Sequence, residues 1–150
     1  MTLADATPAT ARYELDADPA RIDRDVIWRF MTEHAYWGGW RSRGIVDRQI
    51  DASWRVVGCY DRADGAMVGF ARAISDGVSL AYLADVFVLP EHRGHGLGVR
   101  LVDHMIEGSE GPHFRWMLHT GDAHGLYAKA GFRPPDHTYL ERPGRAPDPR

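Results

Sequence analysis

The residues best suited to chemistry are an arginine and three alternating glycines that follow a run of β-forming residues. The run, residues 85–89, stops at Pro90, and an amphipathic helix begins within the turn Arg93-Gly94-His95-Gly96-Leu97-Gly98. A strand, a glycine turn and a helix start together present a row of backbone N–H groups, with the positive end of the helix dipole behind them. Glycine lets the backbone turn sharply and approach a ligand, and an arginine pairs with phosphate oxygens. The pattern predicts a phosphate or pyrophosphate site; the alternative is a plain strand-to-helix turn with glycines for geometry.

This turn differs from two better-known phosphate loops. It lacks the Gly-Lys-Ser/Thr ending of a P-loop, and its alternating glycines do not have the spacing of the dinucleotide-binding fingerprint. Further along, residues 122–132 are typical of a short helix that carries Tyr127 and ends at Gly131. A tyrosine hydroxyl keeps its proton at neutral pH and can donate it to a leaving group. Together the two segments indicate a small transferase that holds a nucleotide-tailed acyl donor.

The elements that must position these residues alternate between strands and helices. Asp23 and Ser42 are each predicted to cap a helix with apolar residues at helical spacing, and residues 61–65 are a hairpin signal. Strands are predicted at 12–15, 54–60, 66–75, 79–88, 114–119 and 138–142, and further helices after the glycine turn, up to Gly108, and at 122–130. This order predicts an α/β (α+β) fold with a central sheet flanked by helices.

Composition favours an ordinary globular domain. The chain has 150 residues, of which 44% are hydrophobic and 26% charged, and this length favours one domain. We expect a domain at 12–142 between flexible tails at 1–11 and 143–150. The net charge of −3 argues against a nucleic-acid partner. No apolar run approaches the roughly 20 residues that span a membrane, and residues 1–11 do not resemble a secretory signal, so we expect a cytoplasmic protein.

The cysteine and histidine side chains do not have the number and spacing of a metal site. Cys59 is the only cysteine and lies in an apolar run, which favours buried packing over a nucleophile. The eight histidines lack a third matched ligand at any zinc spacing. We therefore predict no metal site.

Both motifs resemble those of a known family. Residues 93–98 are similar to the Arg/Gln-x-x-Gly-x-Gly/Ala turn of the GNAT superfamily, the acyl-CoA-dependent N-acyltransferases. Residues 122–132 are similar to that family's second block, in which an alanine is followed four residues later by a tyrosine and then by Gly-Phe. The resemblance extends over about residues 12–142, and a subgroup of small single-domain bacterial members shares the Tyr36-Trp37 segment. It implies a mixed, mostly antiparallel sheet and acetyl-CoA as co-substrate.

The resemblance also implies roles for individual residues. Tyr127 would protonate the departing CoA thiolate, and backbone amides near Val86 would polarise the thioester carbonyl. Many relatives have an asparagine that contacts pantetheine at the position of Thr120, whose hydroxyl would make that contact here. The remaining contacts would be the pantetheine arm on the backbone of Val86, Phe87 and Val88, and the pyrophosphate on Arg93, Gly94, His95, Gly96, Leu97 and Gly98.

Two expectations concern the acceptor. Asp85 is a candidate general base; the alternative is a carboxylate that holds a neighbouring backbone or arginine group. His119 and Glu33 are weaker candidates, and a water chain is a further route for the proton. Between the first two helices, Glu33, His34, Tyr36 and Trp37 are predicted to bind substrate, because aromatic rings suit a cationic amine, whereas Trp40 is predicted to plug the core.

The function favoured by these observations is transfer of an acetyl group from acetyl-CoA to a primary amine of a small molecule or peptide, by direct attack in a ternary complex. One alternative is a non-catalytic acyl-CoA-binding or sensor module that kept the phosphate turn. A weaker one is a nucleotide-binding protein of another kind. Either a monomer or a homodimer is compatible with the sequence.

Overall fold

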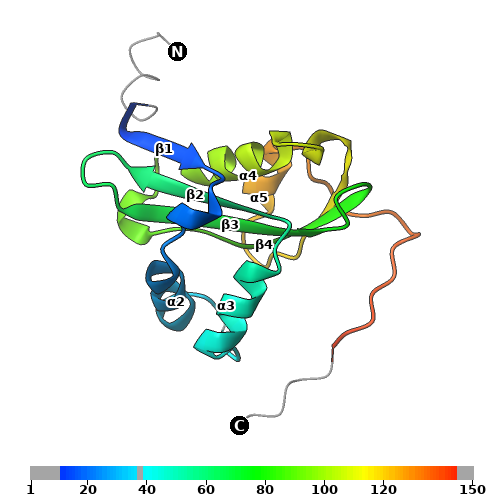
Figure 1. The fold of residues 1–150 in the computed structure, drawn as a ribbon. Helices are drawn as coiled ribbons and strands as arrows, with labels where there is room; N and C mark the ends of the chain where they lie inside the picture. The colour runs from blue at the N-terminus through cyan, green and yellow to red at the C-terminus, as the bar shows by residue number, and fades with distance from the viewer. Residues whose placement is uncertain (1–10, 37–38, 145–150) are drawn as a thin grey trace.

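The structure, a computed structural model, describes residues 11–36 and 39–144 (Figure 1). Within these residues the strands form one five-stranded sheet in the order β1-β2-β3-β4-β5. Neighbouring strands are antiparallel except for β4 and β5, which are parallel. The strands are β1 (Tyr13–Asp16), β2 (Arg55–Asp61), β3 (Met67–Ser75), β4 (Leu80–Val88) and β5 (Arg115–Met117). The predicted mixed, mostly antiparallel sheet is confirmed.

Helices cover both faces of this sheet. The longer helices are α2 (Arg24–Glu33), α3 (Arg43–Asp51), α4 (Leu97–Glu107) and α5 (His124–Lys129), and single 3-10 turns are η1 (Pro19–Arg21), η2 (Pro90–His92) and η3 (Gly111–His113). The two predicted N-caps are confirmed: Asp23 accepts hydrogen bonds from the N–H groups of Asp25 and Val26, and Ser42 accepts one from Ile45. Each cap supplies an acceptor to amides that the helix itself leaves unpaired.

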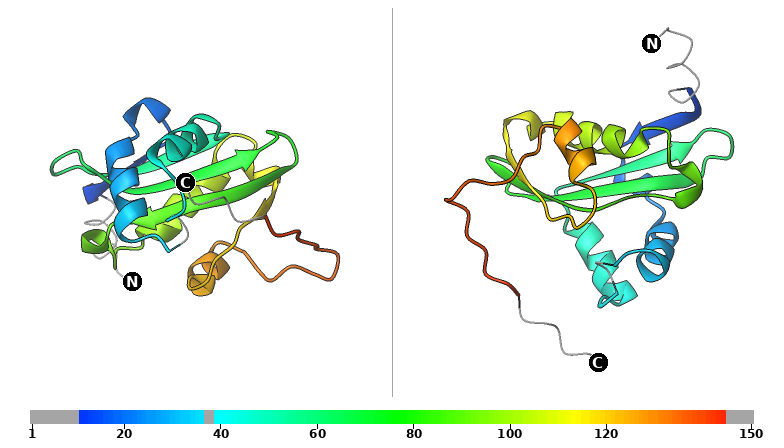
Figure 2. Two further views of the ribbon diagram at one scale, coloured as in Figure 1. Left: turned by 90° about the horizontal axis from the view of Figure 1, so that it is seen from below. Right: turned by 180° about the vertical axis from the view of Figure 1, so that it is seen from behind.

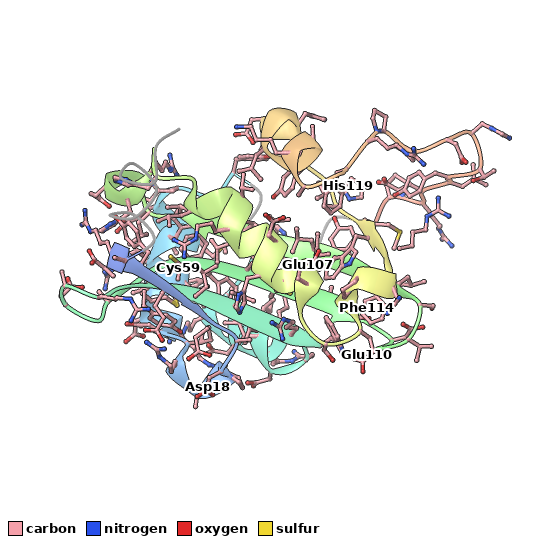
Figure 3. The ribbon with its side chains drawn as sticks, turned by 90° about the horizontal axis from the view of Figure 1, so that it is seen from above. Asp18, Cys59, Glu107, Glu110, Phe114 and His119 are labelled. Atoms are coloured by element: carbon pink, nitrogen blue, oxygen red, sulfur yellow. The ribbon has the colours of Figure 1, made fainter. Side chains whose placement is uncertain are left out.

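The apolar core is divided by the sheet into two layers. On one face α4 lies across the strands, and its fully buried Leu101 and Met105 pack with Val57 and Cys59 of β2 (Figure 3). On the other face α2 and α3 pack against the sheet, where Phe30 stacks on Phe87 at a ring-centroid distance of 4.0 Å (Figures 1 and 2). The central strand β3 is therefore buried on both sides, apart from its last two residues. Burial removes Cys59 from solvent and raises the pKa of its thiol to about 11, as the packing interpretation predicts.

Two predictions about the fold are wrong. The segment 138–142 is not a strand, because Asp136 turns the chain by accepting a hydrogen bond from the Thr138 N–H at 2.9 Å, and the segment then runs away from the sheet (Figure 1). Trp40 does not plug the core, because its side chain is 55% exposed. None of the helices in the described part of the chain has the length and apolar character needed to cross a membrane.

Candidate functional site

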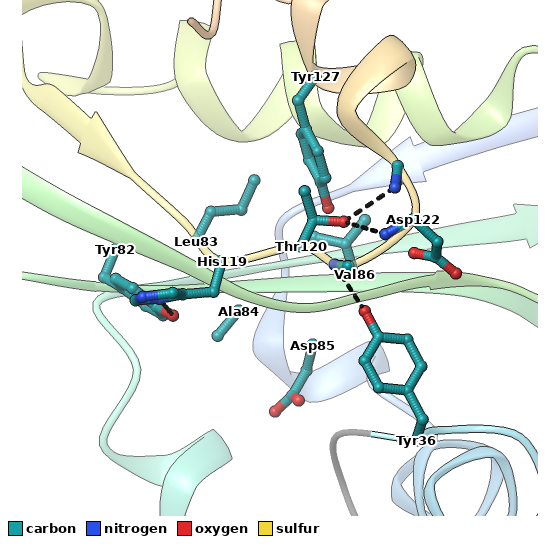
Figure 4. Close-up of a pocket in the computed structure, with 12 residues that line it drawn as sticks. Tyr36, Tyr82, Leu83, Ala84, Asp85, Val86, His119, Thr120, Asp122 and Tyr127 are labelled. Atoms are coloured by element: carbon teal, nitrogen blue, oxygen red, sulfur yellow. Dashed lines mark hydrogen bonds between the residues drawn. The ribbon is translucent and has the colours of Figure 1, made fainter. Parts of the chain in front are cut away.

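The site begins where two parallel strands separate. Within the described residues, β4 pairs with β5 at three positions, from Leu80↔Arg115 to Tyr82↔Met117, and the two strands then diverge. The gap opens into a cavity of about 320 Å³ between β4 and the loop that joins β5 to α5 (Figure 4). The backbone of β4 borders this cavity from residues 82 to 86 and then leads towards the glycine turn.

A β-bulge shapes the wall of the cavity. On β3 and β4, Phe70 pairs with Phe87 and Arg72 with Ala84. One residue of β3, Ala71, therefore lies opposite two residues of β4, Asp85 and Val86. Asp85 has a φ of 54°, in the left-handed region. Holding a non-glycine residue there costs about 1–3 kcal/mol, and a bulge re-aims the backbone at the point where ladder pairing is interrupted. The bulge thus turns peptide groups of β4 at the wall of the cavity.

Two arginines hold the side chain of the bulge residue. Arg41 donates from Nη1 and Nη2 to the two Asp85 carboxylate oxygens at 2.9 and 3.0 Å, and Arg72 donates from Nε to Oδ2 at 2.7 Å. All three side chains are buried. Burial by itself raises the pKa of Asp85, but the hydrogen bonds and charges of the two arginines outweigh burial and lower it. Of the two interpretations of Asp85, this geometry favours the carboxylate that holds arginines.

Tyr127 extends from α5 towards the cavity (Figure 4). Its helix ends at Lys129, Gly131 beyond it has a left-handed φ of 89°, and the Phe132 N–H donates a hydrogen bond to the Tyr127 carbonyl at 3.0 Å. Burial, followed by the nearby Tyr36 and Asp122, raises the pKa of Tyr127 to about 12. A phenol with such a pKa stays protonated at neutral pH, as a proton donor must.

The glycine turn presents an exposed backbone. Gly94 and Gly96 have φ values of 85° and 72°, and a Cβ at either position would meet nothing within 4 Å. Gly96 is the N-cap of α4, and no described side chain caps that helix start. Arg93 lies alongside, its Nε donating to the Val88 carbonyl at 3.1 Å, which leaves its terminal nitrogens directed elsewhere. The turn therefore combines left-handed glycines, a helix N-terminus and a guanidinium on one open surface.

Three other residues that are predicted to contact acetyl-CoA also have a role in the fold or at the cavity. A Cβ on Gly98 would lie 2.7 Å from Leu126 Cδ1, so glycine at this position lets α4 and α5 pack closely. Phe87 is buried in the core, which leaves only its backbone for a ligand. Thr120 lines the cavity, and its Oγ1 accepts hydrogen bonds from the Asp122 and Ala123 amides at 3.4 and 3.0 Å. The threonine hydroxyl hydrogen remains available for an acceptor on a ligand.

The predicted acceptor residues are divided by the structure. Tyr36 lines the main cavity and accepts a hydrogen bond from the Gly121 N–H at 3.0 Å (Figure 4). Glu33 and His34 instead border a second, smaller cavity of about 140 Å³ beside Pro90. Trp37 lies outside the described residues.

Sequence reasoning missed several residues at the main cavity. Arg41 and Arg72 hold Asp85, and Tyr82 borders the cavity in contact with His119. Residues two apart lie on the same face of a strand, so the strand predicted at 79–88 could have placed Tyr82 on one face with Ala84. No local signal links either arginine to Asp85, because they are 44 and 13 residues away along the chain.

Comparisons with known proteins identify the family of this chain. A family model described as an acetyltransferase (GNAT) domain matches residues 53–134, more than half of the chain. A protein of Gibberella zeae that bears the name acetyltransferase is 33% identical over 128 residues, which cover 79% of this chain and 72% of that protein. The family model includes the glycine turn at residues 93–98.

Solved structures of other proteins share the fold of this chain. The crystal structure of a GNAT-family acetyltransferase from Xanthomonas campestris pv. campestris is 38% identical with a TM-score of 0.80, covering 88% of this chain and 93% of that one. An acetyltransferase from Clostridium acetobutylicum, whose structure contains acetyl-CoA, shares the fold at 14% identity with a TM-score of 0.64, over 87% and 94% of the two chains. Because the family model and two relatives above 30% identity extend over most of the folded domain, the chain belongs to the GNAT acetyltransferase family.

Proposed function

We propose that this protein transfers the acetyl group of acetyl-CoA to a primary amine of a small molecule or peptide, by direct attack in a ternary complex. The observation that carries the proposal is the Tyr127 hydroxyl, on a half-buried side chain that keeps its proton and faces the gap between β4 and β5 (Figure 4). An amine that attacks a thioester needs a proton donor beside the departing sulfur, and Tyr127 supplies one.

The binding of acetyl-CoA follows the backbone of β4. The edge of β4 that faces β5 beyond Tyr82 is the place for the pantetheine arm, because that arm carries amides that pair with a strand edge. The pyrophosphate would lie on the turn after β4, where the exposed backbone of Gly94 and Gly96 meets the start of α4. The Arg93 guanidinium adds a positive charge at the same surface.

The reaction has one bond-forming and one bond-breaking event. The amine nitrogen bonds to the thioester carbonyl carbon, and the carbonyl oxygen takes up negative charge that a β4 amide at the bulge would stabilise. The carbon–sulfur bond then breaks, the sulfur takes the Tyr127 proton, and Tyr127 recovers a proton from solvent. The nitrogen loses one proton, so the products are an acetamide and coenzyme A.

The test combines binding with turnover. Calorimetry should detect acetyl-CoA binding, and a library of primary amines should contain members that release thiol from acetyl-CoA only when the enzyme is present. Mass spectrometry of the acceptor should show a gain of one acetyl group. Binding without thiol release from any amine would contradict the catalytic proposal and leave a binding module, and no binding at millimolar acetyl-CoA would contradict both.

A further inference from the structure

A chain of three hydrogen-bonded side chains borders the same cavity and takes part in no step described above. Tyr82 Oη lies 2.6 Å from His119 Nδ1, and His119 Nε2 lies 2.7 Å from Glu141 Oε2. Tyr82 and His119 both line the cavity that contains Tyr127 (Figure 4). The three residues come from β4, from the loop after β5, and from the C-terminal segment that leaves the sheet. Their contact therefore depends on the tertiary fold.

The carboxylate determines the direction of the hydrogen bonds. The hydrogen bond with His119 lowers the pKa of Glu141, so its carboxylate is ionised and only accepts. The His119 Nε2 must then carry the hydrogen that is donated to Glu141, which leaves Nδ1 as the acceptor for the Tyr82 hydroxyl. The Tyr82 hydroxyl thus donates to His119, and its oxygen, on a residue that lines the cavity, keeps lone pairs that can accept a proton.

We propose that Tyr82, His119 and Glu141 form the relay that removes the proton lost by the acceptor nitrogen. This inference rests on the proposed acetyl transfer. After attack, the proton of the nitrogen passes through cavity water to the Tyr82 oxygen, and the Tyr82 proton moves to His119 Nδ1. The resulting imidazolium is stabilised by Glu141, a positioning residue. It returns the proton to solvent, because the side chains of His119 and Glu141 are 56% and 48% exposed.

The surroundings of the relay support this direction of transfer. Burial, with Tyr139 and Glu141 nearby, raises the pKa of Tyr82, so the phenol remains protonated and passes its proton on only when it receives another. The charge of Arg72, on the neighbouring strand, is engaged by Asp85. The same ion pair makes Asp85 a poor base, so it does not compete with the relay for the proton. The titratable and charged groups of the described residues around the relay are Arg72 on β3, Asp85 on β4, Asp122 after β5, Tyr127 on α5, Tyr36 after α2, and Tyr139 on the C-terminal segment.

The test compares three variants with a matched control, using acetyl-CoA and an amine that the wild type acetylates. His119→Gln keeps a hydrogen-bonding side chain that cannot take up a proton, Tyr82→Phe interrupts the path, and Glu141→Gln removes the charge behind His119. His113→Gln changes an exposed histidine on η3 and is the control. We expect kcat to fall about 100-fold in the first two variants and less in Glu141→Gln, with the KM for acetyl-CoA within twofold of wild type.

The pH profile separates a relay from a structural role. Wild-type kcat should fall towards acid, because a histidine that is already protonated cannot take up another proton, and this limb should be absent from His119→Gln but present in His113→Gln. Calorimetry with acetyl-CoA shows that each variant is folded. A His119→Gln enzyme with wild-type kcat and an unchanged acid limb would overturn the relay alone. A wild type that binds acetyl-CoA but acetylates no amine would overturn the proposed function and the relay with it.

Discussion

At the scale of single residues, burial has different outcomes for the two ionisable groups at the bulge. Tyr127 is partly buried beside Tyr36 and the carboxylate of Asp122, and burial followed by these two neighbours raises its pKa to about 12. Asp85 loses solvent but gains Arg41 and Arg72, so its pKa falls. Tyr127 is therefore protonated and Asp85 ionised at neutral pH, and only the first has a proton to donate. In the proposed reaction Tyr127 is the acid, whereas the Asp85 carboxylate holds the side chains of two buried arginines.

The acid role predicts the behaviour of Tyr127→Phe. We expect kcat to fall about 100-fold because the thiolate must leave without a proton donor, while the Kd for acetyl-CoA changes less than twofold. Tyr60→Phe is the matched control, since Tyr60 is a buried tyrosine whose hydroxyl has no hydrogen-bond partner among the described residues. Removing an unpaired buried hydroxyl should leave kcat unchanged and stabilise the fold by about 1 kcal/mol. Steady-state kinetics and thermal melts measure both; equal kcat values in the two variants would remove the acid role.

The ion pair predicts how Asp85 affects stability. A group whose pKa is lowered by folding stabilises the protein above its ordinary pKa, and this contribution is lost as the pH falls through the lowered value. Asp85→Asn leaves two buried arginines without their counter-charge, which costs about 3–5 kcal/mol at neutral pH. Melting temperatures between pH 2 and pH 7 should therefore converge for wild type and variant towards acid. A variant as stable as wild type at pH 7 would contradict the ion pair's structural role.

A second substitution tests whether the unpaired charge of Arg72 causes the loss of stability in Asp85→Asn. Arg72→Met in the Asp85→Asn background removes one of the stranded charges and should recover part of the lost stability, which a double-mutant cycle measures.

Sequence reasoning located the local parts of the site and missed the distant ones. The glycine turn and Tyr127 were recognisable because each motif occupies a few consecutive residues whose conformational needs are visible in their types. The partners of Asp85 and of His119 were not, because Arg41 and Glu141 are separated from them by 44 and 22 residues. Only the folded chain determines which of its 17 guanidinium groups meet which of its 21 carboxylates, so the sequence alone leaves both interpretations of Asp85 open.

At the scale of elements, the glycine turn is the part whose conformation no other residue adopts easily. Gly96→Val should weaken acetyl-CoA binding at least 10-fold, because a branched side chain opposes a φ of 72° and occupies the open surface at the start of α4. Gly65→Val is the control: Gly65 has a φ of 74° in the β2–β3 hairpin and equally open surroundings. Both variants should lose about 1–2 kcal/mol of stability, and calorimetry should find weaker binding only in the first.

Most elements were predictable because their signals are local. The caps Asp23 and Ser42 and the hairpin at 61–65 lie where the sequence placed them, since capping and turn chemistry depend on neighbouring residues. The bounds of the last elements were not: β5 covers only Arg115–Met117 because it separates from β4, and 138–142 leaves the sheet after the Asp136 turn. Trp40 shows the same limit, because an aromatic residue carries no sign of whether a core is available for it.

At the scale of the whole molecule, ligand binding and folding are linked. The cavity and the glycine turn are both built around β4, which is paired with β3 along most of its length. If acetyl-CoA binds only the native state, a concentration about 100 times Kd stabilises the fold by about 2.7 kcal/mol, or about 5–10 °C for a chain of this size. Differential scanning fluorimetry measures the shift; desulfo-CoA should give a similar one and ATP a smaller one, and the absence of any shift would contradict specific binding.

The burial of Cys59 gives this molecule a built-in reporter. The thiol has no exposed surface, lies between α4 and the sheet, and keeps its proton because burial raises its pKa to about 11. A thiol-reactive dye is thus excluded while the core is closed, so any early colour in an assay comes from coenzyme A and not from the protein. Slow labelling of this single cysteine then requires β2 to open. If acetyl-CoA stabilises the native state, it slows this labelling, so the rate with and without acetyl-CoA reports on occupancy of the cavity.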